Sequence, residues 1–411
     1  MSKKEEISVL LINRYFFPDV AAVAQLMGNL AEDLVKSSCN VSVLRGNSPY
    51  NDVVNQSDRD TKAFDKIKIH KVPYLDLEGR SSLVHFLNYL TFHLSALSRL
   101  ITLPYKDVVI TFTSPPLISF IGYLAKVLKG ARFVHVVEDM YPEVAAELGF
   151  VEEDSLFSRV AKAFSGFVFR RADRLVVLSN NMRQKVLDRG VNEEKVEVIP
   201  NWNDGDKIYP ISDEENGFLD EHDLRDKFVV EYSGHMGEGH NFVPVLNCAK
   251  SLQNYKDIVF LLIGDGPRRK EIEEFVNAND LSNVKLLPYQ DQEDLLYSLN
   301  AADVSLVSLR SRLTGLIVPS KIYGILAAGS PVVYLGDDNS EIARVVNDGE
   351  CGIVVGEDDT KGLEEAIMTI YGKDELKEKY GKNARSYFME KFDRKIATKR
   401  YHSLIMDVAR E

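Results

Sequence analysis

The stretch LIVPSKIYGILAAGSPVV, residues 316–333, carries the signals of a short helix followed by a buried strand. Ser320 is a favourable N-cap residue, so a helix is expected to begin at Lys321. Gly329 is typical of a helix C-terminus, and Pro331 opens the apolar run PVVYL, which is typical of a strand. The N–H groups of a helix N-terminus beside a lysine suit an anionic, nucleotide-like ligand. A packed helix with a solvated lysine is an equally good interpretation of this stretch alone.

The alternation of strand and helix extends in both directions from this unit. Apolar runs of strand length recur along the chain, separated by stretches with helical spacing; examples are ISVLLINRYF, NVSVLRG, DVVITFTSPP, RFVHVV, FVVEYSG, IVFLLIGDG and VSLVSL. This pattern predicts an α/β fold of doubly wound parallel sheets with helices on both faces. In such sheets, ligands bind beyond the carboxyl ends of the strands.

The length of the chain and one irregular segment predict two domains. The chain has 411 residues, more than one ordinary core contains. Residues 199–227 are rich in Asn, Asp and Glu and interrupt the alternation, so we interpret them as the inter-domain linker. We expect a first domain over residues 1–204, joined by the last helix at about residues 390–411, and a second over residues 205–389. The gap between two such domains is the usual place for an active site.

Composition excludes several classes of function. The net charge is −12, which argues against a general nucleic-acid binder because such proteins need a basic surface. Cys39, Cys248 and Cys351 are far apart, so they predict neither a metal site nor a disulfide. No secretory signal and no run of 18 uncharged apolar residues is present, which predicts a cytoplasmic protein.

Two glycine-containing loops follow predicted strands of the second domain. In YSGHMGEGHN, Gly234 and Gly237 would let the backbone approach a phosphate, and His235 could donate a hydrogen bond to it. In IGDGPRRKEIEEF, Arg268 belongs to a cationic cluster at a helix start, which a bound anion would compensate. Tight turns that need glycine and arginines that reach solvent are the alternative interpretations.

These loops, with further segments, resemble the family-4 retaining glycosyltransferases. The segments are YFFPDVAAVAQLMGNLAEDL, VEDMYPEVAAELG, ADRLVVLS, VIPNWND, YSGHMG, IGDGPRRKEI and AAGSPVV, and they cover nearly the whole chain. They are most similar to a bacterial subgroup that assembles O-antigen, capsule and exopolysaccharide and includes amino-sugar transferases. The resemblance implies a GT-B fold of two Rossmann-like domains facing a central cleft, with the donor on the second domain and the acceptor on the first. It also implies no required metal and no cofactor other than the nucleotide-sugar co-substrate.

The resemblance also assigns a role to each donor-site position. It places the donor against Gly234, His235, Gly237, Arg268, Tyr289, Ser320, Lys321 and Glu341. Lys321 would stabilise the leaving diphosphate, with His235 beside it, and Glu341 would bind the ribose hydroxyls. The glutamate pair common in the broader family is absent here, because Leu316 and Gly324 stand at those positions.

In the first domain the resemblance points to two short segments. Glu138 and Asp139 follow the strand RFVHVV and would orient sugar hydroxyls, with helix capping by Asp139 as the alternative. Pro18 and Asp19 lie in the family's acceptor loop, with capping by Asp19 as the alternative. The sequence Asp204-Gly205-Asp206 matches a metal-binding pattern of another transferase class, but its place in the predicted linker argues against a metal there.

Basic amphipathic segments of the first domain suggest contact with a membrane surface. SLFSRVAKAFSGFVFRRA combines apolar residues with Arg159, Lys162, Arg170 and Arg171, and FIGYLAKVLKGAR adds Lys126, Lys129 and Arg132. Core helices with a solvated face are the alternative. The acceptor in this subgroup is commonly a lipid-linked saccharide, so we expect peripheral contact with the inner face of the cytoplasmic membrane.

The sequence therefore predicts a retaining glycosyltransferase that moves a sugar, such as an N-acetylhexosamine or a deoxy derivative, from a UDP-sugar to a lipid-linked or saccharide acceptor. Two alternatives stay open. One is a UDP-sugar 2-epimerase, which shares the two-domain architecture but needs more acid–base carboxylates. The other is a non-catalytic nucleotide-sugar-binding scaffold protein, which the missing glutamate pair permits.

Overall fold

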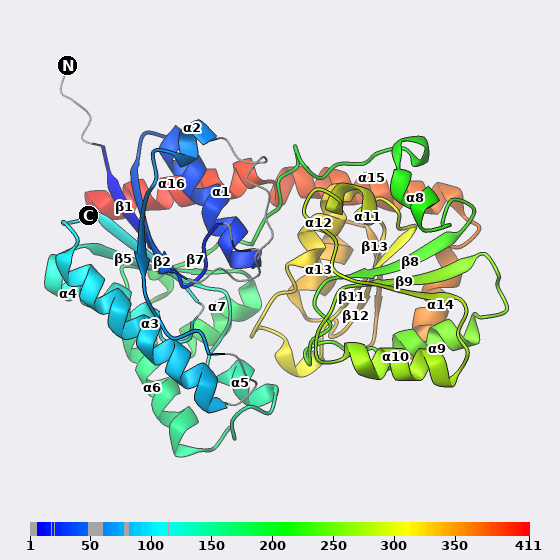
Figure 1. The fold of residues 1–411 in the computed structure, drawn as a ribbon, viewed down its shortest axis with the longest axis horizontal. Coiled ribbons are helices and arrows are strands. Elements are labelled where there is room, and N and C mark those ends of the chain that lie inside the picture. Colours follow the sequence, from blue (N-terminus) through cyan, green and yellow to red (C-terminus); the bar gives the residue numbers. More distant parts are fainter. Residues whose placement is uncertain (1–5, 18, 20, 48–60, 78–81, 114) are drawn as a thin grey trace. The chain divides into compact units, whose positions relative to one another are not determined.

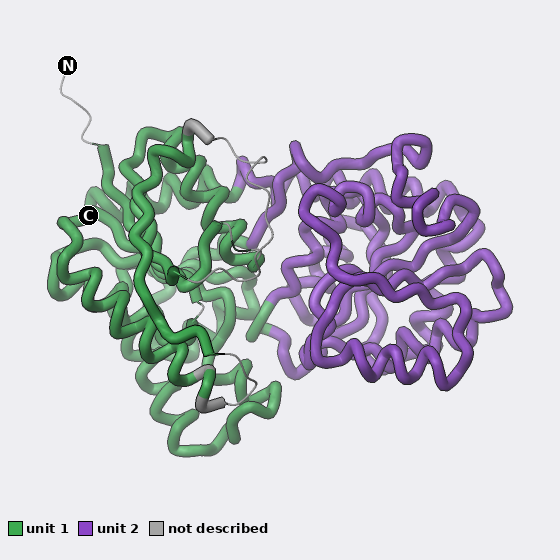
Figure 2. The backbone as a smooth tube through the Cα atoms, viewed as in Figure 1, with its two compact units in different colours: residues 1–200, 315–317, 397–411 green, residues 201–314, 318–396 purple. Residues whose placement is uncertain are grey.

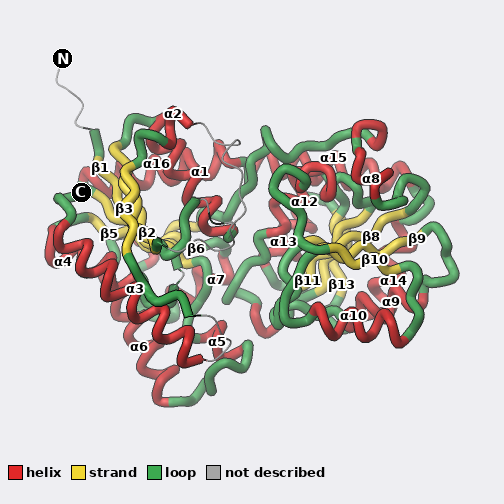
Figure 3. The backbone as a smooth tube through the Cα atoms, viewed as in Figure 1, coloured by secondary structure: helices red, strands yellow, loops and turns green. Residues whose placement is uncertain are grey.

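The computed structural model describes residues 6–17, 19, 21–47, 61–77, 82–113 and 115–411. The chain forms two compact units (Figure 2). Unit 1 contains residues 1–200, 315–317 and 397–411, and unit 2 contains residues 201–314 and 318–396. Each unit is one parallel sheet flanked by helices, as the alternation of apolar runs and helical spacing predicts (Figures 1 and 3).

Unit 1 has a seven-stranded parallel sheet with the strand order β3-β2-β1-β4-β5-β6-β7. Its strands are β1 (Ser8–Ile12), β2 (Asn40–Gly46), β3 (Lys68–Val72), β4 (Val108–Phe112), β5 (Arg132–Val137), β6 (Arg174–Val177) and β7 (Val196–Val198). Its helices are α1 (Ala22–Lys36), α2 (Thr61–Phe64), α3 (Ser82–Thr102), α4 (Ser119–Lys129), α5 (Glu143–Glu147), α6 (Leu156–Arg171) and α7 (Asn180–Leu187), together with most of α16 (Arg394–Arg410). The order reverses at β1, which is the doubly wound arrangement.

Unit 2 has a six-stranded parallel sheet with the order β10-β9-β8-β11-β12-β13. Its strands are β8 (Phe228–Ser233), β9 (Ile258–Ile263), β10 (Val284–Leu287), β11 (Val304–Ser308), β12 (Val332–Leu335) and β13 (Gly352–Val355). Its helices are α8 (Gly217–Glu221), α9 (Val243–Ser251), α10 (Arg269–Ala278), α11 (Leu295–Leu299), α12 (Lys321–Ala328), α13 (Glu341–Asp348), α14 (Thr360–Ile370) and α15 (Asp374–Lys391). The order reverses at β8, so the loops that follow β8 and β11 lie beside each other at the carboxyl edge of the sheet.

The central strands are buried on both faces, which explains why their sequences are continuous apolar runs. Every residue of β4 and β9 is buried. In unit 1, Leu10 and Ile12 of β1 pack with Phe92 of α3 and Ile121 of α4. In unit 2, alternate residues of the central strands pack with α9 and α14 on one face of the sheet. The two cores fix the strand ends from which the candidate site is built.

Helix α12 matches the predicted unit at both ends, with one difference. Gly329 closes the helix in the left-handed conformation at φ 71°, as a C-terminal glycine is expected to do. Ser320 occupies the N-cap position, but its backbone is already helical (φ −64°, ψ −18°) and its side chain makes no capping hydrogen bond. The predicted helix start, with Ser320 as the N-cap and Lys321 as the first helical residue, is therefore confirmed, although the hydroxyl takes no part because a capping bond requires an extended N-cap backbone.

Candidate functional site

Two glycine turns at the carboxyl edge of the unit 2 sheet lie in direct backbone contact. Gly234 follows β8 with φ 130°, and Gly264 follows β9 with φ 135°. A Cβ atom on Gly264 would stand 2.0 Å from the carbonyl oxygen of Gly234, so no side chain fits there. The backbone hydrogen bond from Gly234 to Ile263 (2.9 Å) joins the two strand ends. Glycine is thus required by both the backbone conformation and the close approach.

The next residues of the two loops are joined by further hydrogen bonds. The Met236 N–H donates to the Asp265 carbonyl (2.8 Å), and the Arg268 N–H donates to the Met236 carbonyl (3.0 Å). Tyr289, after β10, donates through its hydroxyl to the Asp265 carbonyl (3.2 Å), and the same hydroxyl lies 3.2 Å from Nδ1 of His235. The predicted donor-site residues His235, Arg268 and Tyr289 therefore come together in one cluster at the carboxyl ends of β8, β9 and β10.

Lys321, the first residue of α12, reaches into this cluster. Its Nζ atom lies 3.3 Å from the centroid of the Tyr232 ring, and a Cβ atom on Gly234 would stand 3.2 Å from both Cε and Nζ of Lys321. The residue as a whole is partly exposed, but the Nζ atom is buried and has no hydrogen-bond partner among the described residues. Burial lowers the pKa of Lys321 well below its ordinary value, and Glu231 opposes that shift. A buried ammonium that lacks a partner is costly unless an anion satisfies it.

Glu231 is the acidic group that acts on Lys321. It lies within β8, is completely buried, and neither of its carboxylate oxygens has a hydrogen-bond partner in the part of the chain that the structure describes. Burial raises the pKa of Glu231 to about 8, although Lys321 favours its charged form. The sequence-based prediction missed this residue, although one charged residue inside the apolar run FVVEYS was the available signal.

The two histidines of the β8 loop are neutral at physiological pH. Burial lowers the pKa of His235, with a further contribution from Lys321. Burial and Lys321 also lower the pKa of His240 to about 3, and its Nδ1 hydrogen-bonds the Ser308 carbonyl. His235 is exposed, so it could offer a neutral N–H donor to a ligand, whereas His240 is held by the backbone of β11.

Arg268, Gly237 and Ser320, which were also predicted for the donor site, have the following contacts and exposure. The Arg268 guanidinium pairs with Glu238 (3.3 Å) and with Glu271, so the acidic partners that compensate it at the start of α10 belong to the protein itself. Gly237 lies against the His235 ring, because a Cβ atom on Gly237 would stand 2.7 Å from His235 Cδ2. Ser320 is exposed at the start of α12.

Glu341 is the first residue of α13, after β12. Its carboxylate pairs with Arg344 (3.1 Å), and the helix is capped by Ser340, whose hydroxyl accepts from the Ala343 N–H (3.2 Å). The predicted ribose ligand is therefore placed at a helix start beyond a strand of the same sheet, and its ribose contact stays a prediction.

In unit 1, Glu138 and Asp139 follow β5 directly. The Glu138 N–H donates to the Thr113 hydroxyl (3.2 Å), which ties this loop to the residue after β4. Burial raises the pKa of Asp139 to about 6. The N-cap of α5 is Pro142, so the capping alternative for Asp139 is wrong. Both carboxylates thus follow the end of β5, and their predicted role in orienting sugar hydroxyls stays a prediction.

The Asp19 carboxylate makes a hydrogen bond and an ion pair within unit 1. Its carboxylate accepts from the Phe16 N–H (2.9 Å) and pairs with Arg45 at 3.2 Å, and the carboxylate is buried. The N-cap of α1 is Ala21, so Asp19 does not cap that helix. Pro18, the other predicted acceptor residue, lies outside the described residues.

Neither aspartate of the Asp204-Gly205-Asp206 segment is free. Asp204 pairs with Arg394 (3.1 Å) and Asp206 with Lys395 (2.7 Å). In the part of the chain that the structure describes, no group of three His, Cys, Asp or Glu side chains is arranged to hold a metal ion.

Comparison with known proteins identifies both units. The family model described as Glycosyl transferase 4-like domain matches residues 22–202, and the one described as Glycosyl transferases group 1 matches residues 218–387. The "Probable glycosyltransferase WbjE" of Pseudomonas aeruginosa is 26% identical over 246 residues, which are 60% of this chain and 61% of that protein. WcaI of Escherichia coli, described as a putative glycosyl transferase of colanic acid biosynthesis, is 26% identical over 226 residues, 54% of this chain and 55% of that protein. The match thus spans less than two thirds of either relative.

Solved structures share the whole fold at low sequence identity. Sucrose-phosphate synthase from Thermosynechococcus elongatus superimposes with a TM-score of 0.78 at 18% identity, covering 98% of this chain and 99% of that chain. HepE from Anabaena, in complex with UDP and glucose, superimposes with a TM-score of 0.73 at 16% identity, covering 98% and 100%. The two matched domains and this shared architecture show that the chain belongs to the GT-B-fold glycosyltransferases, with a family 4-like first domain and a group 1 second domain.

Proposed function

We propose that the protein is a retaining glycosyltransferase that moves a sugar from a UDP-sugar to a saccharide or lipid-linked acceptor in the biosynthesis of a surface polysaccharide. The observation that carries this proposal is Lys321, whose Nζ atom is buried against the Gly234 turn without a hydrogen-bond partner among the described residues. A nucleoside diphosphate beside that turn would supply the missing anion. Family membership and the colanic acid role in WcaI's description support the biosynthetic setting.

The chemistry of glycosyl transfer suits this site. When the bond from the sugar C1 to the phosphate oxygen breaks, negative charge grows on the leaving diphosphate. A fixed cation stabilises that charge most in the transition state, because it needs no reorganisation. Lys321 would supply the cation and His235 a neutral N–H donor, so the mechanism requires no metal. Gly234 would allow the close approach of the phosphates, as Gly237 would beside it.

The proposal also assigns contacts to the nucleotide part of the donor and to the hydroxyl groups of the sugars. The complexes of HepE with UDP and with UDP-glucose show what that structural neighbour binds, and they support a UDP-sugar donor here. Tyr289 would contact the base end of the nucleotide and Glu341 the ribose. In unit 1, Glu138 and Asp139 would orient hydroxyl groups of the reacting sugars, because carboxylates accept strong hydrogen bonds from hydroxyls.

A lipid-linked acceptor would require unit 1 to approach a membrane, and the exposed residues of three helices support that contact. Helix α4 packs against both α3 and α6, and the three lie alongside one another in Figure 1. Large apolar side chains are exposed on all of them: Phe86, Leu90, Leu94 and Ile101 on α3, Val127 and Leu128 on α4, and Leu156, Phe157 and Val160 on α6. The sequences of these helices contain seven Lys and Arg and no Asp or Glu, in a chain of net charge −12. We propose that this helical layer contacts anionic lipid.

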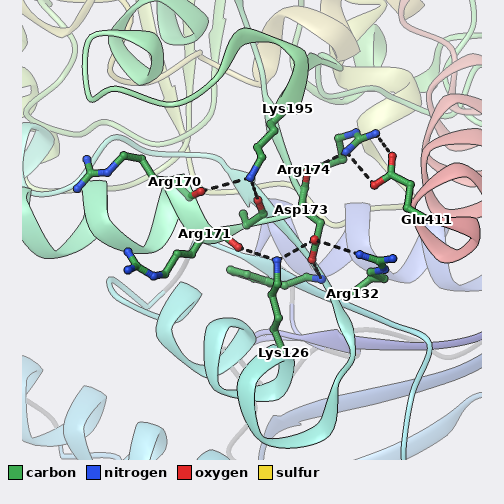
Figure 4. A network of polar contacts seen from close by, with 10 residues as sticks. Lys126, Arg132, Arg170, Arg171, Asp173, Arg174, Lys195 and Glu411 are labelled. Atoms are coloured by element: carbon green, nitrogen blue, oxygen red, sulfur yellow. Dashed lines mark hydrogen bonds and ion pairs between the residues drawn. The ribbon is translucent and has the colours of Figure 1, made fainter.

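Some of the residues that were predicted to contact a membrane are instead paired or buried within the protein. Lys126 and Arg132 both pair with Asp173, at 2.7 and 3.6 Å, so they belong to an internal ion-pair network (Figure 4). Val168 of α6 is buried, and Phe164 packs against Phe120 with ring centroids 5.3 Å apart. The large apolar residues that α6 exposes therefore lie in its first turns. No helix among the described residues is long and apolar enough to cross a bilayer.

Release of UDP tests the proposed function. Purified protein is incubated with a panel of UDP-sugars, with and without polyprenyl-diphosphate-linked saccharides, in the presence of EDTA. We expect stoichiometric UDP release and a glycosylated product with the donor's anomeric configuration only when an acceptor is present. A 2-epimerase would release UDP or convert the donor without an acceptor. A scaffold protein would bind the donor without turnover, and either result would contradict the proposal.

A further inference from the structure

The imidazole ring of His235 is held in place from several sides. A Cβ atom on Gly237 would stand 2.7 Å from Cδ2 of this ring, and one on Gly266 would stand 3.0 Å from its Cε1 atom. The Tyr232 hydroxyl donates to the backbone carbonyl of His235 (2.7 Å), and Nδ1 of the ring lies 3.2 Å from the Tyr289 hydroxyl. Glycine at both positions thus leaves room for the ring, and the ring turns Nδ1 towards Tyr289.

The hydroxyl group of Tyr289 has one hydrogen and two acceptors within reach. The carbonyl oxygen of Asp265 and Nδ1 of His235 both lie 3.2 Å from it. The Asp265 carbonyl already accepts the Met236 N–H at 2.8 Å, so it does not depend on the hydroxyl. If the hydroxyl donates to Asp265, Nδ1 must carry the hydrogen of a neutral ring, and Nε2 is an acceptor. If the hydroxyl donates to Nδ1, Nε2 carries the hydrogen and is a donor.

We propose that Tyr289 is a positioning residue of the donor site, which donates its hydroxyl hydrogen to Nδ1 of His235 when a nucleoside diphosphate binds and thereby keeps the ring hydrogen on Nε2. The diphosphate then accepts a hydrogen bond from Nε2, beside the cation of Lys321. This role rests on the proposed function, because it takes the ligand to be a nucleoside diphosphate. The ring loses the hydrogen at Nδ1 and gains one at Nε2 by exchange with solvent, so its charge does not change.

The His235 ring needs this donor because its surroundings otherwise favour a hydrogen on Nδ1. Burial lowers the pKa of His235 below its ordinary value of 6.5, with a further contribution from Lys321, so the ring is neutral at pH 7.5 and carries one hydrogen. Among the described residues, the Tyr289 hydroxyl is the donor within reach of Nδ1, whereas the Asp265 carbonyl favours a protonated ring. Without the hydroxyl, Nδ1 would therefore keep the hydrogen, and Nε2 would present a lone pair to the diphosphate.

Nuclear magnetic resonance of the histidine rings tests this role directly. Protein with isotope-labelled histidine is titrated with UDP at pH 7.5, and long-range proton–nitrogen correlation spectra show which ring nitrogen carries the hydrogen. The His235 signals are identified by their absence in His235→Gln. In the wild-type complex with UDP we expect the hydrogen on Nε2. In Tyr289→Phe, which keeps the ring and removes the hydroxyl, we expect it on Nδ1, and UDP affinity should fall about 2- to 10-fold.

Tyr255→Phe is the matched control, because Tyr255 is an exposed tyrosine just before β9, at the opposite edge of the same sheet. It should leave both the position of the His235 hydrogen and the UDP affinity unchanged. Three results would overturn the role of Tyr289: a hydrogen on Nδ1 in the wild-type UDP complex, hydrogens on both ring nitrogens, or an unchanged hydrogen position in folded Tyr289→Phe.

The wild-type spectrum alone decides if Tyr289→Phe does not fold. A hydrogen on Nε2 in the UDP complex then supports the role, and any other position overturns it. If UDP does not bind the wild type at all, the proposed function fails together with the role of Tyr289. UDP binding with the hydrogen on the wrong nitrogen overturns only the role of Tyr289.

Discussion

Lys321 is the residue on which the donor site depends most. Its ammonium is buried between the Tyr232 ring and Gly234, so replacing it by Met removes the charge while keeping most of the packing volume. We expect Lys321→Met to weaken UDP binding by about 10- to 100-fold, since a hydrogen bond to a charged group contributes roughly 1.5–3 kcal/mol. Isothermal titration at pH 7.5 measures the change, and Lys361→Met, at an exposed lysine of α14, is the control. Equal UDP affinity in wild type and Lys321→Met would contradict the site.

Asp139 should make the stability of the protein depend on pH. Burial raises its pKa in the folded state to about 6 from an ordinary value of 3.8. Its contribution to stability is therefore full below about pH 4 and is lost as the pH rises through 6, because the folded state resists ionisation. Asp139→Asn should raise the thermal midpoint relative to wild type above pH 6 and lose this advantage near pH 4. Asp154→Asn, at an exposed position, should show no such trend. A pH-independent difference for Asp139→Asn would contradict the assignment.

At the residue scale, the sequence predicts which residues form the candidate site better than it predicts how deeply their side chains are buried. The sequence predicted Gly234 and His235 in the turn after a strand and Lys321 at a helix start, and the structure brings Lys321 beside Gly234, whereas their contact with a phosphate stays a prediction. Burial of the lysine side chain was not predictable, since it depends on which loops meet at the sheet edge. Glu231 was missed for the same reason: a carboxylate in a strand is interpretable only when its neighbours on adjacent strands are known.

At the scale of elements, the turns after β8 and β9 form one rigid unit. Gly264 has φ 135°, and a Cβ atom there would collide with the Gly234 carbonyl oxygen. We expect Gly264→Ala to destabilise the protein by at least about 2 kcal/mol and to abolish UDP binding, because the Gly234 turn must shift. Gly372→Ala is the matched control. Gly372 also has a positive φ, 70°, but nothing among the described residues lies within 4 Å, so only about 1 kcal/mol is expected. Denaturant unfolding compares the two, and equal losses would contradict the close contact.

The order and type of elements follow from the sequence, whereas details of their ends do not. Continuous apolar runs predict the buried parallel strands, and Gly329 predicts the end of α12. Ser320 is the N-cap residue as predicted, but the sequence did not predict its helical backbone, which leaves the hydroxyl without a capping hydrogen bond. Helix α6 was predicted as amphipathic, but tertiary packing divides its apolar residues between a face buried against α4 and an exposed first part.

At the scale of the whole molecule, the chain combines a strongly acidic charge with a basic, apolar helical layer. We expect the protein to bind vesicles with anionic lipid at low salt and to ignore purely zwitterionic vesicles, because the attraction is partly electrostatic. Leu156→Gln with Phe157→Gln should reduce binding several-fold. Met389→Gln, at an exposed position of α15, should not. Vesicle co-sedimentation measures both. A wild type that ignores anionic vesicles at low salt would contradict the membrane contact.

The architecture of the whole chain, two Rossmann-like units, was predictable because strand and helix alternate along its full length. The identities of the donor and the acceptor are less predictable from the sequence, because specificity for them depends on a few side chains at loop ends. Family membership indicates glycosyl transfer, and the buried Lys321 Nζ atom supports the proposed anionic ligand.

The most direct test of the proposed donor site is a calorimetric titration of the wild-type protein with UDP, GDP and ADP in the presence of EDTA. We predict metal-independent binding of UDP in preference to the other two, and loss of that binding in Lys321→Met. The absence of binding by any of the three nucleotides, or UDP binding that is unchanged in Lys321→Met, would contradict the assignment of this site.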